Sequence, residues 1–270
     1  YIRFLANSQI FLDGIAGSQT TVVNATKDVK PFLQTYFANP TQAIREVMEK
    51  DNLTMAITMT VIRALAMSLA VFGVFNSICN FIQKTATQSM GGFSLNNLGA
   101  GVSISAPFVE SFLYGILIAV IGMALFVLLL FIMVKIQKGN TSIRAIYEAS
   151  ACNGVLTSLL LLLTFVFSYL SLQMTLAFVV LSLLSWVICG VLTAQIVCPN
   201  SNNGLFWIMY FLGVAIIFVA GFKIFPSLLL KAMGGITVGA YGQSLKLKDA
   251  IGNINLSNIT DVLDELMDIF

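Results

Sequence analysis

An almost unbroken apolar run of 44 residues, from Gly154 to Val197, constrains this chain more than any other feature of its sequence. As one helix the run would be about 66 Å long, more than twice the roughly 30 Å hydrocarbon thickness of a bilayer. Its polar minimum is Ser171 to Thr175, and a turn there leaves two segments of about 20 residues, the length that one span requires. We therefore predict a tight hairpin between two transmembrane helices.

Three further windows are apolar enough to cross a bilayer: Thr54 to Ile82, Ser111 to Ile136 and Leu205 to Leu230. Charged residues make up only 10% of the chain, against roughly 25% in soluble proteins. The mean hydropathy is +0.91. The sequence thus predicts an all-α polytopic membrane protein of five spans, with amphipathic N- and C-terminal helices and its two termini on opposite sides of the membrane.

This pattern divides the chain into four parts. Residues 1–31 form an N-terminal extramembrane segment, residues 32–53 amphipathic interfacial helices, residues 54–232 the five-span domain, and residues 233–270 a tail with an acidic amphipathic helix. Asn39-Pro40 is typical of a helix cap followed by the first helical residue. We expect that helix to lie along the membrane surface and to turn into the first span at Asp51-Asn52.

Basic residues predict the orientation. Lys135, Lys138 and Arg144 lie on the short connection between the second and third spans, and Arg45 and Lys50 precede the first span. Five spans place both groups on one side, and short cytoplasmic loops are enriched in Lys and Arg. We expect a cytoplasmic N-terminus and an extracytoplasmic C-terminus, with a bacterial plasma membrane as the favoured location.

Several kinds of chemistry lack the residues they need. The chain has no histidine, which excludes Ser-His-Asp and Cys-His pairs and HExxH zinc sites, and its glycine clusters lack the Lys-Ser/Thr of a phosphate loop. No two cysteines are spaced as CxxC, so we interpret all four as buried small hydrophobes: Cys79, Cys152, Cys189 and Cys198. A net charge of +2 without a basic block does not favour nucleic acid. We expect no enzyme activity, cofactor, metal or small-molecule substrate.

Two pairs of charged residues are candidate intramembrane ion pairs. Arg63 lies in the first span and Glu148 just before the third span on the same side, while Glu110 and Lys223 lie toward the opposite side. An unpaired charge near a helix centre costs at least about 2.5 kcal/mol. The alternatives are that both cations snorkel to the nearest interface or that they serve a substrate or proton.

Small residues at helical spacing predict where spans pack closely. In the first span they are Ala66, Ala70, Gly73 and Ser77, and in the second Ser111, Gly115, Ala119 and Gly122. The predicted C-terminal helix adds an apolar face that either packs on the domain or binds a partner, formed by Val262, Leu263, Leu266, Met267 and Phe270.

Three stretches resemble the Yip1-domain family of membrane proteins, in particular its prokaryotic members. They are FANPTQAIREVMEKDNL (Phe37 to Leu53), TSIRAIYEASACNGVLTSLLLLL (Thr141 to Leu163) and the tight hairpin between the third and fourth spans, so that the resemblance covers about residues 32–232. It implies five spans, a cytoplasmic N-terminus and a non-enzymatic role in membrane organisation or trafficking. The chain lacks the cysteines of the zinc ribbon that often precedes prokaryotic members, and the DLYGP-type motif of Rab-associated ones.

The sequence therefore favours a scaffold or accessory subunit that acts within the bilayer through other membrane proteins. The alternative is a permease-like subunit of a transporter or exporter that works with a separate ATPase. A permease should have a continuous polar cavity involving Arg63, Asn76 or Gln195, and a cytoplasmic coupling helix, for which Ile143 to Ser150 is the candidate. A scaffold should bury those groups and expose an apolar stripe toward a partner.

Overall fold

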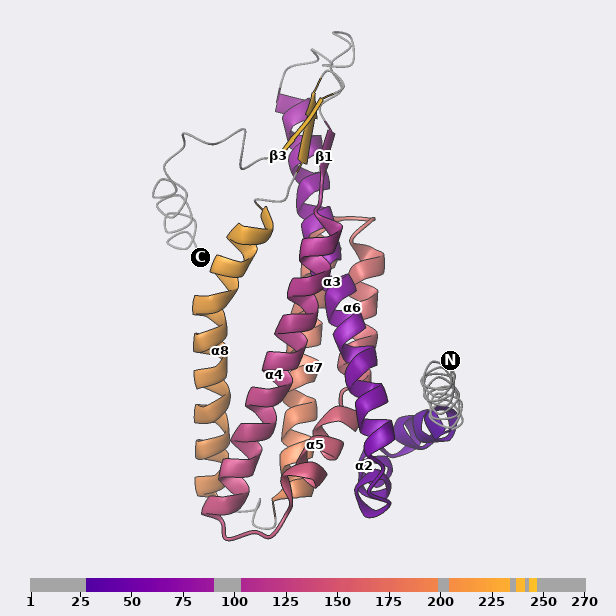
Figure 1. Ribbon diagram of the computed structural model, residues 1–270, viewed down its shortest axis with the longest axis vertical. Helices are drawn as coiled ribbons and strands as arrows, with labels where there is room; N and C mark the ends of the chain where they lie inside the picture. The colour runs from indigo at the N-terminus through magenta and orange to yellow at the C-terminus, as the bar shows by residue number, and fades with distance from the viewer. Residues whose placement is uncertain (1–27, 90–102, 199–203, 234–236, 241–242, 247–270) are drawn as a thin grey trace, which may run out of the picture.

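The computed structural model describes residues 28–89, 103–198, 204–233, 237–240 and 243–246. Five helices run roughly along one direction as a bundle (Figure 1): α3 (Leu53–Ser89), α4 (Phe108–Ile136), α6 (Val155–Phe167), α7 (Leu172–Val197) and α8 (Gly204–Met233). Shorter helices lie at one end, formed by residues 28–38, α2 (Pro40–Glu49) and α5 (Ile143–Cys152). The predicted helical class is confirmed.

Three helices within the described residues are long and apolar enough to cross a membrane, over Leu53–Lys84, Phe108–Ile136 and Leu172–Val197. Helices α5 and α6 meet the same criteria only as a pair, which is bent by 43° at Asn153 and Gly154. In α8 the segment Phe206–Val219 is a shorter apolar helix. The outward faces of these helices expose many large apolar side chains, as contact with lipid requires.

The hairpin that the sequence predicts is present. Helix α6 ends at Phe167 and α7 begins at Leu172, so the chain reverses within residues 168–171, at the edge of the predicted turn. Ser171 is the N-cap of α7, where its hydroxyl accepts a hydrogen bond from Met174 N at 3.2 Å. The rings of Phe167 and Phe178 stack with their centroids 4.4 Å apart, and this contact packs the two helices together beside the turn.

The elbow that leads into α3 also follows the prediction. Asn39 caps α2, with Oδ1 accepting from Gln42 N at 3.1 Å, and Pro40 is the first helical residue. The chain then turns at Asp51, which has a positive φ of 51°, and Asn52 Oδ1 accepts from Met55 N at 3.0 Å. We expected α2 to lie along the membrane surface. Its apolar face packs instead on α5 of the same chain.

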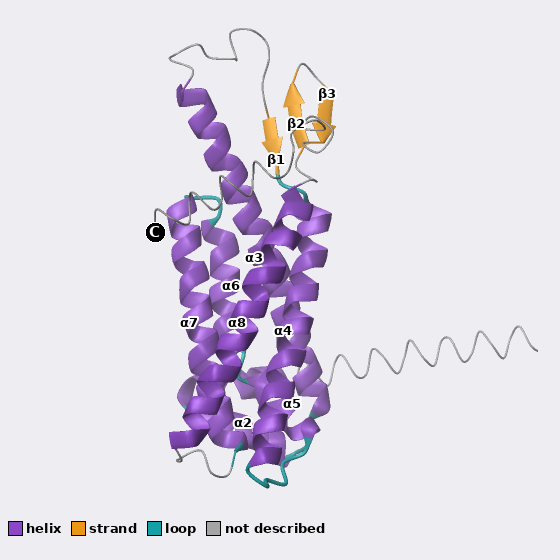
Figure 2. Ribbon diagram, turned by 90° about the vertical axis from the view of Figure 1, so that its left-hand side faces the viewer, coloured by secondary structure: helices purple, strands orange, loops and turns teal. Residues whose placement is uncertain are grey.

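A small antiparallel sheet lies beyond the other end of the bundle (Figure 2). It consists of β1 (Ser103–Ser105), β2 (Thr237–Ala240) and β3 (Gln243–Lys246) in the order β1-β2-β3, with Ile104 opposite Val238 and Val238 opposite Leu245. The sequence does not reveal these strands, because three or four residues are too few to show an alternating pattern. The sheet joins the segment before α4 to the segment after α8.

The main core lies at the end of the bundle opposite the sheet. Side chains of α2, α3, α4, α5, α7 and α8 are buried together there, with Ile44, Leu130 and Ile146 completely inaccessible. A smaller cluster of Ala66, Ala70 and Leu161 lies between α3 and α6. The large core therefore holds the short helices α2 and α5 to the long helices.

Candidate functional site

The small-residue stripe of α3 faces α6 and α7. Ala66 and Ala70 are buried against Leu161, and a Cβ added at Gly73 would lie only 3.0 Å from the Cα of Phe165. One turn farther along, Ser77 Oγ accepts from Thr175 Oγ1 at 3.2 Å. The backbones of α3 and α6 therefore approach closely at Gly73.

The stripe of α4 faces α3, with one exception. Ser111 and Ala119 are buried, and a Cβ at Gly115 would meet the Ser68 backbone, at 2.8 Å from its nitrogen. Gly122 has open space where its Cβ would lie, with no atom within 4 Å. Gly115 is therefore a point of close helix contact and Gly122 is not.

Asn153, at the break between α5 and α6, is the centre of a buried hydrogen-bond network. The Tyr36 hydroxyl donates to the carbonyl oxygen and to Oδ1 of Asn153, each at 3.2 Å. Asn153 Nδ2 donates to Thr193 Oγ1 at 2.8 Å and to the Cys189 carbonyl on α7. Burial raises the pKa of Tyr36, so that its hydroxyl stays a donor. One amide side chain thus ties the helix of residues 28–38 and the bend to α7.

Arg63 lies beside this network without a carboxylate partner. Its guanidinium occupies the place where a side chain at Gly154 would be, and Nη1 lies 3.3 Å from the Met123 sulfur. Its Nε is buried without a hydrogen-bond partner. The cation is therefore held mainly by packing, because a thioether is only a weak acceptor.

A second charged cluster joins α5 to the elbow between α2 and α3. Arg144 Nε lies 2.8 Å from Asp51 Oδ1 and 3.1 Å from Glu148 Oε1, and Arg144 Nη2 donates to the Asp51 carbonyl at 2.9 Å. The side chain of Glu148 is 0% exposed, and its Oε2 has no partner. A single guanidinium therefore serves two carboxylates that differ greatly in their access to water.

These contacts correct the expected pairing of Arg63 with Glu148, because Glu148 is bonded to Arg144 instead. The spacing of Arg144 and Glu148, four residues apart on one helix, is the signal that would have found this pair. In the sequence analysis Arg144 served only as evidence for orientation.

Other candidate residues stay predictions. Glu110 is exposed in the first turn of α4, while the side chain of its expected partner Lys223 lies outside the described part of the structure. The same holds for the whole candidate partner-binding face, formed by Val262, Leu263, Leu266, Met267 and Phe270.

The four cysteines are free and buried, as predicted.

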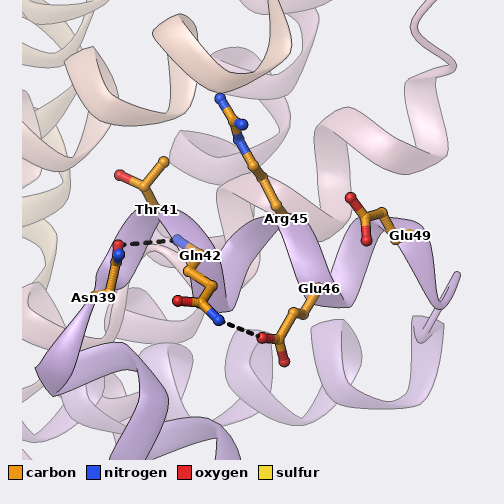
Figure 3. Close-up of a pocket in the computed structure, with 6 residues that line it drawn as sticks. All are labelled: Asn39, Thr41, Gln42, Arg45, Glu46 and Glu49. Carbon is orange, nitrogen blue, oxygen red and sulfur yellow. Dashed lines mark hydrogen bonds between the residues drawn. The ribbon is translucent and has the colours of Figure 1, made fainter.

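The outer side of α2 carries a shallow, open hollow (Figure 3). Asn39, Thr41, Gln42, Arg45, Glu46 and Glu49 line it. Gln42 Nε2 donates to Glu46 Oε1 at 3.0 Å, and Glu46 also lies 3.8 Å from the Lys50 ammonium. All six residues belong to one helix and its cap, so the hollow is the solvated polar face of α2 and is not an enclosed site.

Many buried hydroxyls of the bundle donate to a carbonyl of their own helix, as Ser68 and Thr164 do, and a smaller set of polar side chains bridges two helices. Thr157 and Ser185 join α6 to α7 at 3.2 Å, and Thr60 and the Tyr147 hydroxyl join α3 to α5 at 2.9 Å. No group of three or more His, Cys, Asp or Glu side chains is placed to hold a metal ion in the described ranges. No protein-family model, curated protein or solved structure matches the chain.

Proposed function

We propose that the protein is a non-enzymatic integral membrane protein of five spans that acts as a scaffold or accessory subunit, similar in role to Yip1-domain proteins. Its contribution would be to membrane organisation or trafficking, through contacts with other membrane proteins. The observation that carries this proposal is the burial of α5 inside the bundle.

Helix α5 contains the only candidate for a coupling helix that would receive force from an ATPase. It packs against α2, α3, α4 and α7, and Ile146, Ala149 and Cys152 are buried. Only its N-terminal end, at Ile143 and Arg144, is exposed. A helix enclosed on four sides offers little surface to a cytoplasmic motor, and this favours the scaffold over the permease.

The residues that a permease would use to line a path lie in different surroundings. Arg63 packs against Gly154, and Gln195 is exposed near the end of α7. Asn76 Nδ2 is buried between helices without a partner. Their separate surroundings favour local packing roles over a shared polar cavity.

The five spans of the proposal are α3, α4, the bent pair α5–α6, α7 and α8. Pairing of β1 with β2 puts the start of α4 and the end of α8 at the same end of the bundle, as an odd number of spans requires. Contacts of α2 with α5 likewise bring the basic connection around Arg144 beside the entry to α3. Both features support the five-span topology, and the basic end would face the cytoplasm of a bacterial cell.

Purification of the tagged full-length protein from its native membrane in mild detergent, followed by mass spectrometry, tests the proposed role. We expect membrane proteins in stoichiometric amount and no ATPase. A stoichiometric ATPase that survives washing would contradict the scaffold role and favour the permease.

The topology has an independent test by thiol labelling in sealed membranes. The four native cysteines are buried and so give a low background. We expect Lys138→Cys to react only with reagent on the cytoplasmic side and Met90→Cys only with reagent on the other side. Cytoplasmic labelling at residue 90 would overturn the orientation.

A further inference from the structure

We propose that Glu148 is a proton-binding residue that controls the docking of α5 on the α2–α3 elbow: the protonated residue holds the two together, and its ionisation as the pH rises loosens them. The inference goes beyond the proposed scaffold role and does not depend on it. It rests on the arrangement of Asp51, Arg144 and Glu148.

The docked geometry gives the Glu148 carboxylate too few hydrogen-bond donors. An ionised carboxylate has about four acceptor positions. Glu148 Oε1 accepts only from Arg144 Nε at 3.1 Å, and the same nitrogen lies nearer to Asp51 Oδ1, at 2.8 Å. Glu148 Oε2 is buried with no donor at all. A proton removes the charge that this site cannot solvate.

Neighbouring elements supply no other cation to Glu148. Helix α7 has no charged residue, and Arg45 of α2 is exposed and lines the outer hollow of that helix. The ammonium of Lys50, the C-cap of α2, lies by Glu46, and the Lys135 ammonium of α4 lies over the Phe131 ring. Arg63 of α3 has its guanidinium against Gly154, and the remaining titratable groups of α5, Tyr147 and Cys152, bear no positive charge. Two carboxylates therefore compete for the single charge of Arg144.

Water resolves this competition in favour of Asp51. The Asp51 side chain is 64% exposed and remains hydrated when ionised, whereas Glu148 is 0% exposed. Burial penalises the charged form of Glu148 unless its partners replace water. A proton consequently binds the docked arrangement more strongly than one in which water reaches Glu148, so that raising the pH favours the loosened arrangement.

The experiment measures amide hydrogen exchange of the full-length protein in lipid nanodiscs across a pH series, after correction for the intrinsic effect of pH on exchange. Peptides covering residues 40–52 and 143–152 report on the elbow and on α5. We expect both to lose protection as the pH rises. Protection that is independent of pH, or that increases with pH, would overturn the proposal.

Three substitutions separate proton binding from a purely structural role. Glu148→Gln, which keeps the shape of the protonated side chain, should keep both peptides protected at every pH. Asp51→Asn frees Arg144 for Glu148 and should move the loss of protection to higher pH; asparagine also tolerates the positive φ at this position. Glu49→Gln removes an exposed acid from α2 and should leave the wild-type profile unchanged.

The Glu148→Gln sample is first checked for a single gel-filtration peak and cooperative unfolding. If this variant were poorly folded, the direction of the Asp51→Asn shift would decide the matter alone. A shift to lower pH, or none, would refute the competition for Arg144. A folded Glu148→Gln protein with the wild-type pH profile would refute the role of Glu148.

Discussion

Replacing Gly115 by alanine should weaken the contact between α3 and α4. The added methyl group would collide with Ser68 Cα and would also lie 2.8 Å from Ser68 N. Ordinary contacts are about 3.5–4.0 Å, so the two helices would have to separate by more than about 1 Å. Overpacking of this kind costs about 1–3 kcal/mol, and the backbone of Ser68 cannot move aside as a flexible side chain can.

The matched control is Gly122→Ala on the same helix. No atom lies within 4 Å of the Cβ position at Gly122, so the methyl group meets no obstacle. Alanine favours a helix over glycine by about 1 kcal/mol, a gain that both variants share. We therefore expect Gly115→Ala to be less stable than Gly122→Ala by about 1–3 kcal/mol, the overpacking cost alone.

Thermal unfolding followed with a thiol-reactive fluorophore measures this difference directly. The four free cysteines are buried, so they react only as the fold opens. For a chain of this size, 1 kcal/mol corresponds to about 2–4 °C in Tm. If the two alanine variants melted at the same temperature, α3 and α4 would not approach at Ser68 as the structure has them.

Three further outcomes follow from the bend, from Tyr36 and from the hairpin. Asn153→Ala should lower Tm more than Tyr36→Phe does in the same assay, because it removes three side-chain hydrogen bonds, to the Tyr36 hydroxyl, to Thr193 Oγ1 and to the Cys189 carbonyl, whereas Tyr36→Phe removes two; each is worth about 0.5–1.5 kcal/mol. Burial raises the pKa of Tyr36, so the folded protein loses stability as the pH rises above the pKa of a free tyrosine. Tyr36→Phe should reduce this alkaline loss of stability in melts over a pH series. Ser171→Ala removes the cap of α7 and should cost about 0.5–2 kcal/mol, whereas Ser142→Ala tests the cap of α5 in the same way.

Features with a local signature could be read from the sequence. The cap at Asn39 and the turn near Ser171 depend on residues within a few positions of one another. The close approach at Gly73 depends on a residue too small to obstruct a neighbouring helix. Length alone forced the apolar run from Gly154 to Val197 to fold back. These predictions needed no knowledge of which helices are neighbours.

Partners that are distant in the sequence could not be read in this way. Which cation reaches the Glu148 carboxylate depends on the direction of each side chain and on the 43° bend of the chain. The strands β1 and β2 pair across more than one hundred residues of sequence, between segments with no pattern of their own. Such contacts are set by the packing of the whole bundle.

The bend at Asn153 and Gly154 explains why Arg63 tolerates its surroundings. A helical side chain points toward the N-terminus of its helix, so the Arg63 guanidinium lies nearer the α2 end than its own backbone does. At that level α5 and α6 are interrupted, and the residue facing Arg63 is glycine, whose missing side chain leaves room for the planar cation. Asn153 uses the same interruption to bond Tyr36 and Thr193. A polar interruption and an arginine within a long apolar helix, two separate signals in the sequence, thus form one structural unit, because the interruption leaves room for the guanidinium.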